Sequence, residues 1–317
     1  MTNEDRRIRS LRPPKPSVDP WVAHGSLVEE ERTGRESRER ALTVFLAGAE
    51  CPFTCSFCDL WRWTTDAPTP AGALPAQLSG VLASLDSPLP ERVKLYNASN
   101  FFDLRAVPPD DAIVLASLCS PFLGVTVESH ANTVGPLALD FANRISGRLE
   151  VAIGLETIHP LAMHHLNKRL ELARFDRAAV FLLEHQIDLR VFVLLGAPYV
   201  PHTESVDWTV RTAEYAAKRG ARMVSLIPVR GGNGEMERLA AMGVFVPPTL
   251  SQLEEALEQC VAMRPTIVTA DLWDTDRLPA CADCRADRVA RLRHMNLTGE
   301  VTPRISCRGC NGNGRTS

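Results

Sequence analysis

Lysine is scarce in this sequence, and long hydrophobic runs are absent. Only four of the 317 residues are lysine, so nearly all of the positive charge is arginine, which favours bidentate contacts with anions. The net charge of −3 gives no overall preference for nucleic acid. No apolar run approaches the roughly 20 residues that span a bilayer, and the N-terminus carries charge without the apolar segment of a signal peptide. We therefore expect a cytoplasmic protein without a membrane partner.

Cysteine, by contrast, is well represented, with nine residues. In a chain without a secretion signal, they indicate reduced thiols and metal sites rather than a disulfide framework. Most of them stand in one close triplet and two C-x2-C pairs. The other two, Cys119 and Cys260, lie in apolar helical contexts, where we expect buried small hydrophobic side chains.

Composition divides the chain into three parts. Residues 1–40 are charged and contain proline, and we expect a loosely ordered basic leader, either a solvated tail or a contact for a phosphate backbone. Residues 41–263 alternate short apolar runs with amphipathic stretches, and the apolar content of 45% is ample for a large core. Residues 264–317 form a C-terminal extension that carries the two C-x2-C pairs.

Apolar strands that alternate with amphipathic helices indicate an α/β fold with a parallel sheet covered by helices. Strands are predicted at residues 41–47, 92–96, 124–128, 149–154, 189–195 and 223–228, with a seventh candidate at 266–272. Helices are predicted at residues 74–85, 110–118, 136–145, 174–185, 205–219 and 251–263. Polar residues follow the apolar strands, as expected if the chemistry lies at their carboxyl ends.

The triplet is Cys51, Cys55 and Cys58, a C-x3-C-x2-C motif directly after the first predicted strand. Three thiolates on one short loop can hold three irons of a cubane cluster and leave the fourth iron open to another ligand. The alternatives are a chance grouping of cysteines or part of a zinc site. Zinc usually takes four ligands in paired knuckles, and no fourth Cys or His is close in sequence.

This triplet, with Phe57 directly before its third cysteine, resembles the cluster loop of the radical S-adenosylmethionine (SAM) superfamily. The segments at 154–157, 166–169 and 195–199 resemble its Elongator-catalytic-subunit-like branch, and the chain is most similar to the radical subunit of archaeosine synthase and its bacterial relatives. The resemblance covers about residues 41–263. It implies a partial (β/α)6 TIM-like barrel, here with a small C-terminal Cys-rich metal-binding appendage, a [4Fe–4S] cluster on the triplet, and SAM on the open iron.

The resemblance also implies residues that contact the cofactor. Those at the end of the second predicted strand are Asn97, Ser99 and Asn100, which lie where the superfamily binds the amino group of SAM, although a polar turn explains them equally well.

Later strands add further candidates for cofactor contacts. Glu128 ends the third strand, but His130 stands where the branch commonly has arginine. Glu156 would face the cofactor or substrate, and Arg169 would pair with a carboxylate or remain an exposed charge at a helix end. Pro198 belongs to a turn that approaches the adenine in the branch.

The C-terminal pairs are Cys281 with Cys284 and Cys307 with Cys310. Two such pairs are typical of a four-thiolate zinc ribbon, and an auxiliary iron–sulfur cluster accepts the same ligands. His294 lies between the pairs and is either a substitute ligand or a surface residue. Before them, Asp271 and Asp274 either bind a polar substrate or form turns.

The expected function is therefore reductive cleavage of SAM and hydrogen abstraction from a substrate carbon. The resemblance implies an electron donor such as flavodoxin or ferredoxin, and a tRNA or a second subunit as a partner in modified-nucleoside metabolism. A small metabolite or natural-product intermediate is the alternative substrate. A non-catalytic protein that binds zinc and an iron–sulfur cluster is the alternative of a different class.

Overall fold

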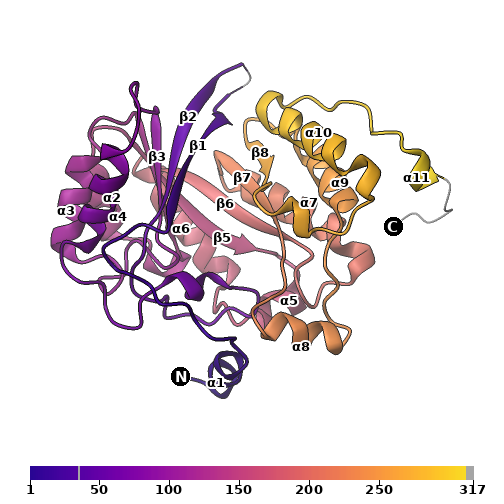
Figure 1. Ribbon diagram of the computed structural model, residues 1–317, viewed down its shortest axis with the longest axis horizontal. Helices are drawn as coiled ribbons and strands as arrows, with labels where there is room; N and C mark the ends of the chain where they lie inside the picture. The colour runs from indigo at the N-terminus through magenta and orange to yellow at the C-terminus, as the bar shows by residue number, and fades with distance from the viewer. Residues whose placement is uncertain (35, 312–317) are drawn as a thin grey trace.

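The computed structural model describes residues 1–34 and 36–311, and its centre is one eight-stranded sheet in the order β1 to β8 (Figure 1). Residues 312–317 of the expected C-terminal extension lie outside the described residues. The strands are β1 (Gly25–Arg32), β2 (Arg38–Phe45), β3 (Arg92–Tyr96), β4 (Gly124–Ser129), β5 (Arg148–Glu156), β6 (Asp188–Leu195), β7 (Met223–Pro228) and β8 (Ile267–Ala270). β1 pairs antiparallel with β2, and every later neighbouring pair is parallel. The six predicted strands and the seventh candidate correspond to β2–β8.

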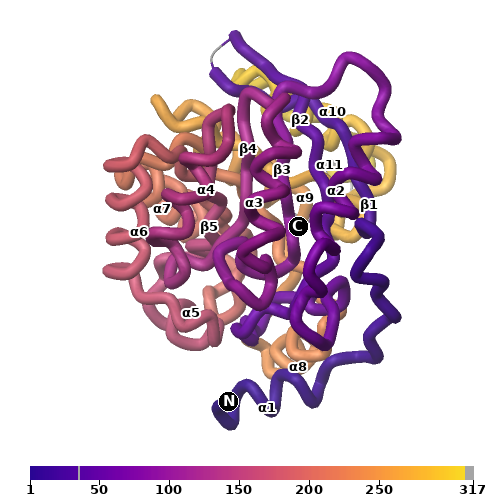
Figure 2. The backbone as a smooth tube through the Cα atoms, turned by 90° about the vertical axis from the view of Figure 1, so that its left-hand side faces the viewer, coloured from indigo at the N-terminus to yellow at the C-terminus, as the bar shows by residue number. Residues whose placement is uncertain are grey.

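Helices connect the parallel strands and cover the outer face of the curved sheet (Figure 2). The helices of the described chain are α1 (Asn3–Ser10), α2 (Ala73–Ala83), α3 (Pro109–Leu118), α4 (Pro136–Arg144), α5 (Pro160–His165), α6 (Leu172–Glu184), α7 (Ser205–Lys218), α8 (Glu235–Ala241), α9 (Leu250–Cys260), α10 (Arg285–Thr298) and α11 (Arg308–Asn311). Those from α2 to α9 lie between parallel strands in the sequence, whereas α1 precedes the sheet and α10 and α11 follow it. α3, α4 and α5 begin at proline, whose fixed φ suits a first helical turn. No helix in the described ranges is long and apolar enough to cross a membrane.

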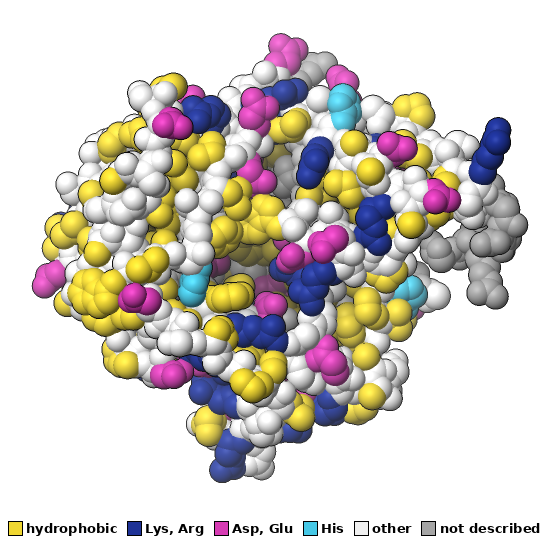
Figure 3. Space-filling view, viewed as in Figure 1, with side chains coloured by type: hydrophobic (Ala, Val, Ile, Leu, Met, Phe, Trp, Pro, Cys, Tyr) yellow, Lys and Arg dark blue, Asp and Glu magenta, His cyan; other side chains and the backbone are white. Residues whose placement is uncertain are grey.

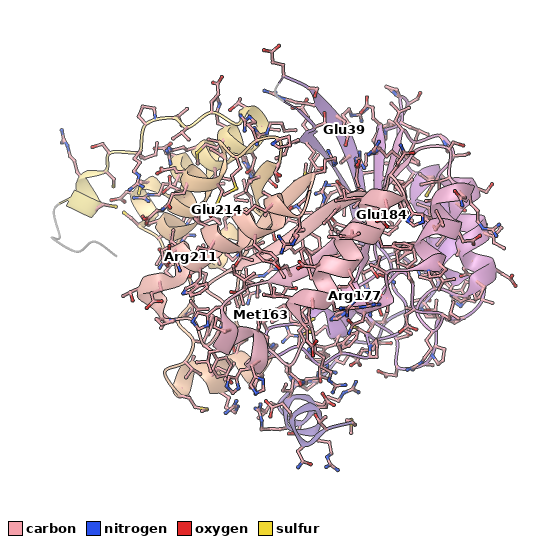
Figure 4. The ribbon with its side chains drawn as sticks, turned by 180° about the vertical axis from the view of Figure 1, so that it is seen from behind. Glu39, Met163, Arg177, Glu184, Arg211 and Glu214 are labelled. Carbon is pink, nitrogen blue, oxygen red and sulfur yellow. The ribbon has the colours of Figure 1, made fainter. Side chains whose placement is uncertain are left out.

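The amphipathic pattern of the helices explains this arrangement. In α6, Phe175 and Leu182 are buried against the sheet, whereas Arg177 and Glu184 are exposed. Figure 4 shows α6 and α7 lying side by side on the back of the sheet, with their labelled charged side chains directed outward. The main hydrophobic core therefore lies between the strands and these outer helices.

The expectation of a loosely ordered leader over residues 1–40 differs from the structure, which forms α1 and β1 there. β1 is rich in glutamate, and its charge hides it from a search for apolar runs. Its pairing with β2 places Glu29 and Glu31 on the inner face, where both line a polar cavity. A charged strand is stable there because its side chains face cations and solvent rather than the apolar core.

The sheet is a partial barrel, because no ladder joins β1 to β8 in the described residues. α10 lies along this seam and contacts both strands. Asn296 of α10 exchanges two hydrogen bonds of 2.8 Å with the backbone of Ala270, so it satisfies part of the free edge of β8. Arg32 of β1 donates across the seam to the Val268 carbonyl at 3.1 Å. The last strand and α10 thus complete the barrel, although the sequence places both in the C-terminal extension.

Candidate active site

The cysteine triplet lies on the loop that follows β2, at the carboxyl edge of the parallel strands. Hydrogen bonds from distant elements fix this loop. Asn233 donates to the carbonyls of Ser56 and Cys58 at 2.8 and 3.1 Å, and the amide of Ser56 donates to the Leu166 carbonyl at 2.9 Å. The loop is therefore held in shape by the segments that precede α6 and α8.

The three thiols are suited to an iron–sulfur cluster. In the described part of the chain their sulfur atoms do not all lie within 4.8 Å of one another, and a cubane cluster takes each thiolate on a different iron. Asn100 donates to Cys51 Sγ at 3.3 Å, a contact that stabilises a thiolate. Burial raises the pKa of the Cys55 thiol to about 12 and also raises that of Cys58. A metal centre offsets this penalty, because it binds the thiolate form.

Unpaired polar groups follow β3, at the position where the family resemblance predicts contacts with the amino group of SAM. Asn97 is fully buried, and neither its side-chain oxygen nor its nitrogen has a hydrogen-bond partner among the described residues. The buried Ser99 hydroxyl is likewise without one. Ala98 between them has φ of 53°, a strained value for a residue with a Cβ. Orphaned buried groups are rare, so this turn fits a polar ligand.

Asn100 has a different role from its two neighbours. Its side chain donates to Cys51 and accepts from the His130 amide at 2.7 Å, so it links the cluster loop to the end of β4. His130 stacks on Phe53 with ring centroids 4.1 Å apart, and Nε2 lies 3.0 Å from the Lys168 carbonyl. Burial lowers the pKa of His130 to about 3, so it is neutral. His130 thus joins the end of β4 to the cluster loop and to the segment that precedes α6.

Glu128 lines the cavity at the end of β4. It accepts a hydrogen bond of 2.7 Å from the Ala98 amide and so helps to hold the strained turn after β3. Burial raises the pKa of Glu128 to about 7, despite that hydrogen bond. Glu128 therefore presents a carboxyl group to the cavity, and its contact with the cofactor stays a prediction.

Glu156 ends β5 at a bulge and pairs with Lys168, with 2.7 Å between Oε1 and Nζ. Its φ of 69° turns the side chain over Gly154, where a Cβ would collide with Oε1. Lys168 is a buried cation, and its Nζ lies 5.9 Å from the Phe57 ring centroid. The sequence motif predicts a site role for Arg169 and none for its neighbour Lys168. The scarcity of lysine is the one signal in the sequence that distinguishes Lys168.

Arg169 and Pro198 do not line the cavity, whereas Phe57 does. Arg169 pairs with Asp5 of α1, which also accepts from Asn167 at 3.0 Å. The carboxylate that Arg169 contacts in this structure belongs to the N-terminal helix, and a contact of Arg169 with the cofactor stays a prediction. Pro198 is buried in the turn after β6.

A cavity of about 1080 Å³ occupies the concave side of the sheet. Cys58, Glu128 and Glu156 line the end of the cavity that is next to the cysteine loop. Side chains from β1, α10 and the segment after β8 line the opposite end, at the seam. Figure 3 shows the surface hollowed in the middle of the front face, with acidic and basic side chains around the opening. The volume is sufficient for a small ligand beside a cofactor.

The floor of this cavity is an ionic network that the sequence did not reveal. Glu31 of β1 accepts from Lys94 at 3.0 Å and from both terminal nitrogens of Arg190 at 2.8 and 2.7 Å. Arg190 also donates to the buried Glu150 at 2.8 Å, and Arg222 pairs with the same carboxylate. These contacts join β1, β3, β5 and β6 inside the barrel.

The four C-terminal cysteines converge on a second site. Their sulfur atoms all lie within 4.8 Å of one another, with 3.9 Å between Cys281 and Cys307 and 3.7 Å between Cys284 and Cys310. Four thiolates around one tetrahedral ion at about 2.3 Å are separated by about 3.8 Å. None of the four lines the cavity, and the exposed His294 is not in the group. The donor set and spacing fit a single metal ion.

No protein-family model matches this chain, and no curated protein matches its sequence. Solved structures do resemble its fold. Elp3 of the archaeon Methanocaldococcus infernus aligns with 65% of this chain and 55% of its own, with a TM-score of 0.50 and 10% identity. SuiB of Streptococcus suis aligns with 75% of this chain and 49% of its own, with a TM-score of 0.50 and 11% identity. The chain thus spans about half the length of each.

A spore photoproduct lyase variant with a dinucleoside photoproduct aligns with 70% of this chain and 75% of its own, with a TM-score of 0.52 and 12% identity. These three proteins are radical SAM enzymes, and the chain has the partial-barrel fold of that superfamily. At these identities the comparison concerns the fold.

Proposed function

We propose that this protein is a radical SAM enzyme whose Cys51, Cys55 and Cys58 hold a [4Fe–4S] cluster. When bound, the reduced cluster supplies one electron that cleaves SAM into methionine and a 5′-deoxyadenosyl radical, which removes hydrogen from a substrate carbon. The observation that carries the proposal is the triplet at the end of β2, whose third member lines the large cavity.

The chain's own residues bind and orient the cofactor in this proposal. Asn97 and Ser99 offer unpaired polar atoms to the amino-acid part of SAM, and Glu128 offers a carboxylate beside them. Lys168 keeps a positive charge close to the thiolates and to Phe57. The apolar side chains around Phe57, such as Leu194, Val229 and Ile227, exclude water from the same region.

The test is anaerobic reconstitution with iron and sulfide, followed by assay of 5′-deoxyadenosine after reductant and SAM are added. The wild type should bind four irons at the triplet and form 5′-deoxyadenosine. Cys55→Ala should lose this activity, whereas Cys119→Ala, which changes a buried cysteine at the end of α3, should retain it. Product formation by Cys55→Ala would overturn the assignment, and metal uptake without product in the wild type would indicate the non-catalytic alternative.

We also propose that the C-terminal site holds zinc as a structural ion. All four ligands come from the chain, which leaves no open position, and the sulfur separations suit one ion better than a cluster that spreads its ligands over several irons. Arg288 donates to Cys284 Sγ at 3.2 Å and pairs with Glu254 of α9. Metal analysis of Cys307→Ser should show loss of one zinc with the triplet's iron retained.

For the substrate, the cavity favours a small molecule over a tRNA. Its lining has eight carboxylates against five lysine or arginine residues, an excess of negative charge that repels phosphate. A salt-sensitive gel shift with tRNA would argue for the nucleic-acid alternative, because phosphate contacts weaken as salt rises.

A one-electron donor is required by this chemistry, and flavodoxin or ferredoxin is the proposed partner in a cytoplasmic setting. Dithionite replaces this partner in the first assay. Recovery of activity with reduced flavodoxin would then support the pairing, and absence of any stimulation by either donor would argue against it.

A further inference from the structure

The seam side of the cavity combines acidic and aromatic side chains from the β1–β2 hairpin and from the segment after β8, which is distant from the hairpin in sequence. Glu29 of β1 accepts from Trp273 Nε1 at 3.1 Å, and Asp271 accepts from the Trp273 amide at 3.0 Å. The Trp273 ring packs edge to face against Phe45 of β2, with centroids 5.3 Å apart. We call Glu29, Asp271, Trp273 and Phe45 the seam wall; all four line the cavity.

Within the described residues, the two carboxylates of the seam wall have no cationic partner, unlike three other acids that line the cavity. Glu31 pairs with Lys94 and Arg190, Asp274 pairs with Arg230, and Glu156 pairs with Lys168. Among residues 1–34 and 36–311, neither Glu29 nor Asp271 forms a salt bridge. Their only side-chain hydrogen bonds come from the neutral N–H groups of Trp273, so their negative charge remains uncompensated.

Within the described residues, the two unpaired cations of the lining, Arg32 and Arg293, make no hydrogen bond or salt bridge with Glu29 or Asp271. Arg32 is buried and donates to the Val268 carbonyl, and Arg293 is exposed on α10. Low-dielectric walls concentrate the field of the unpaired carboxylates within the cavity. The seam wall is therefore electronegative as well as aromatic, two properties that attract cations.

One unpaired hydroxyl group, that of Ser225, independently indicates that this part of the cavity receives a polar ligand. Ser225 of β7 is only 9% exposed, lines the cavity and makes no side-chain hydrogen bond within the described chain. It pairs in register with Phe192 of β6 and Thr269 of β8, which line the cavity on the same inner face. A buried hydroxyl without a partner is costly unless a ligand or water completes it.

We propose that the seam wall binds a positively charged group of the substrate, an ammonium or guanidinium, through Glu29 and Asp271, with the Trp273 ring covering its apolar part. The proposal rests on the proposed function, because it assigns the substrate class of the same cavity. Each carboxylate accepts a charge-assisted hydrogen bond, and Ser225 accepts or donates one further bond across the cavity. Substrates with a free amine are thereby favoured over neutral or anionic analogues of the same size.

The test uses three four-carbon probes of similar shape: n-butylammonium, 1-butanol and butyrate. Each is titrated into the anaerobically reconstituted protein with SAM present, and binding is followed by ligand-observed NMR. Butylammonium should bind at least about tenfold more tightly than butyrate, a factor that corresponds to one charge-assisted contact. Glu29→Gln and Asp271→Asn, which keep the side-chain shape, should each weaken butylammonium binding by about tenfold. Asp140→Asn, on the outer helix α4, is the matched control and should leave binding unchanged.

Equal binding of the three probes, or unchanged butylammonium binding in both seam-wall variants, would overturn the proposal. Formation of 5′-deoxyadenosine by the unaltered protein is measured in parallel and tests the proposed function separately. Cofactor cleavage without selection for the amine would refute the substrate class alone. Selection for the amine without cofactor cleavage would refute the radical SAM assignment and keep the cation site.

Discussion

Lys168 and Glu156 form an ion pair whose disruption gives a sharp test of the site's architecture. The two side chains are 13% and 7% exposed, and 2.7 Å separates Nζ from Oε1. Burial lowers the pKa of Lys168, but the attraction of Glu156 and of the nearby thiols outweighs it and leaves the pKa raised. Lys168 therefore stays charged over the whole working pH range.

Removal of one partner leaves the other as an uncompensated buried charge, which typically costs about 3–5 kcal/mol. We therefore expect Lys168→Met to lower the free energy of unfolding by about that amount. Replacement of both partners, in Lys168→Met with Glu156→Gln, should recover much of the loss, because no lone charge remains buried. The exposed pair Arg144 and Asp140 on α4 is the control, and its disruption should cost less than about 1 kcal/mol.

The assay is urea unfolding of the metal-free protein, followed by circular dichroism, for the two single variants and the double variant. A double-mutant cycle then isolates the coupling energy between the two side chains. A coupling below about 0.5 kcal/mol would refute the reasoning, because independent losses would mean that the two charges do not compensate each other.

Three further predictions concern the same region. Gly154→Ala should destabilise the protein by about 1–3 kcal/mol in urea unfolding, because the added Cβ would collide with the Glu156 carboxylate. Unchanged stability would contradict the close approach of that carboxylate to Gly154. Asp5→Asn should loosen α1 from the cluster loop, since Asp5 accepts from Thr54, Asn167 and Arg169, and limited proteolysis should then cleave the first residues faster than in the wild type. For Glu128, the folded-state pKa of about 7 lies above the unfolded value, so the native state binds the extra proton. The free energy of unfolding should therefore fall as pH rises from about 4.5 to 7. Glu128→Gln should remove that part of the pH dependence, and an identical pH profile in the variant would count against a buried carboxyl group.

Much of the barrel could be predicted from the sequence because its strands are apolar and short. β2 to β7 each contain a short, largely apolar run, and such runs between amphipathic helices have few other stable arrangements. β1 could not be predicted from apolar runs, because its glutamate side chains face cations and solvent and do not pack in the hydrophobic core. α10 and β8 fall within the predicted C-terminal extension. No local sequence pattern shows that β8 borders the seam of the barrel or that α10 covers it.

The candidate site divides in the same way. Cys51, Cys55 and Cys58, and the four C-terminal cysteines, could be found because metal ligands on one loop or in one ribbon keep a characteristic spacing. Lys168 and Arg169 are adjacent in sequence, yet Lys168 pairs with Glu156 of the site and Arg169 pairs with Asp5 of α1. The two side chains diverge because the chain turns between them, with φ of 56° at Arg169. Which of two neighbours faces inward depends on such backbone angles.

Local periodicity and spacing were enough to predict β2 to β8, the helices α2, α3, α4, α6, α7 and α9, the two cysteine constellations and the polar residues that follow the strands. The folded chain was needed to show that Glu29 meets Trp273, that Glu31 meets Arg190, and that Asp5 meets Arg169. The two members of each pair are far apart in the sequence. Their contacts arise from the closure of the barrel and the docking of the N-terminal segment, which bring distant charges together where water is excluded.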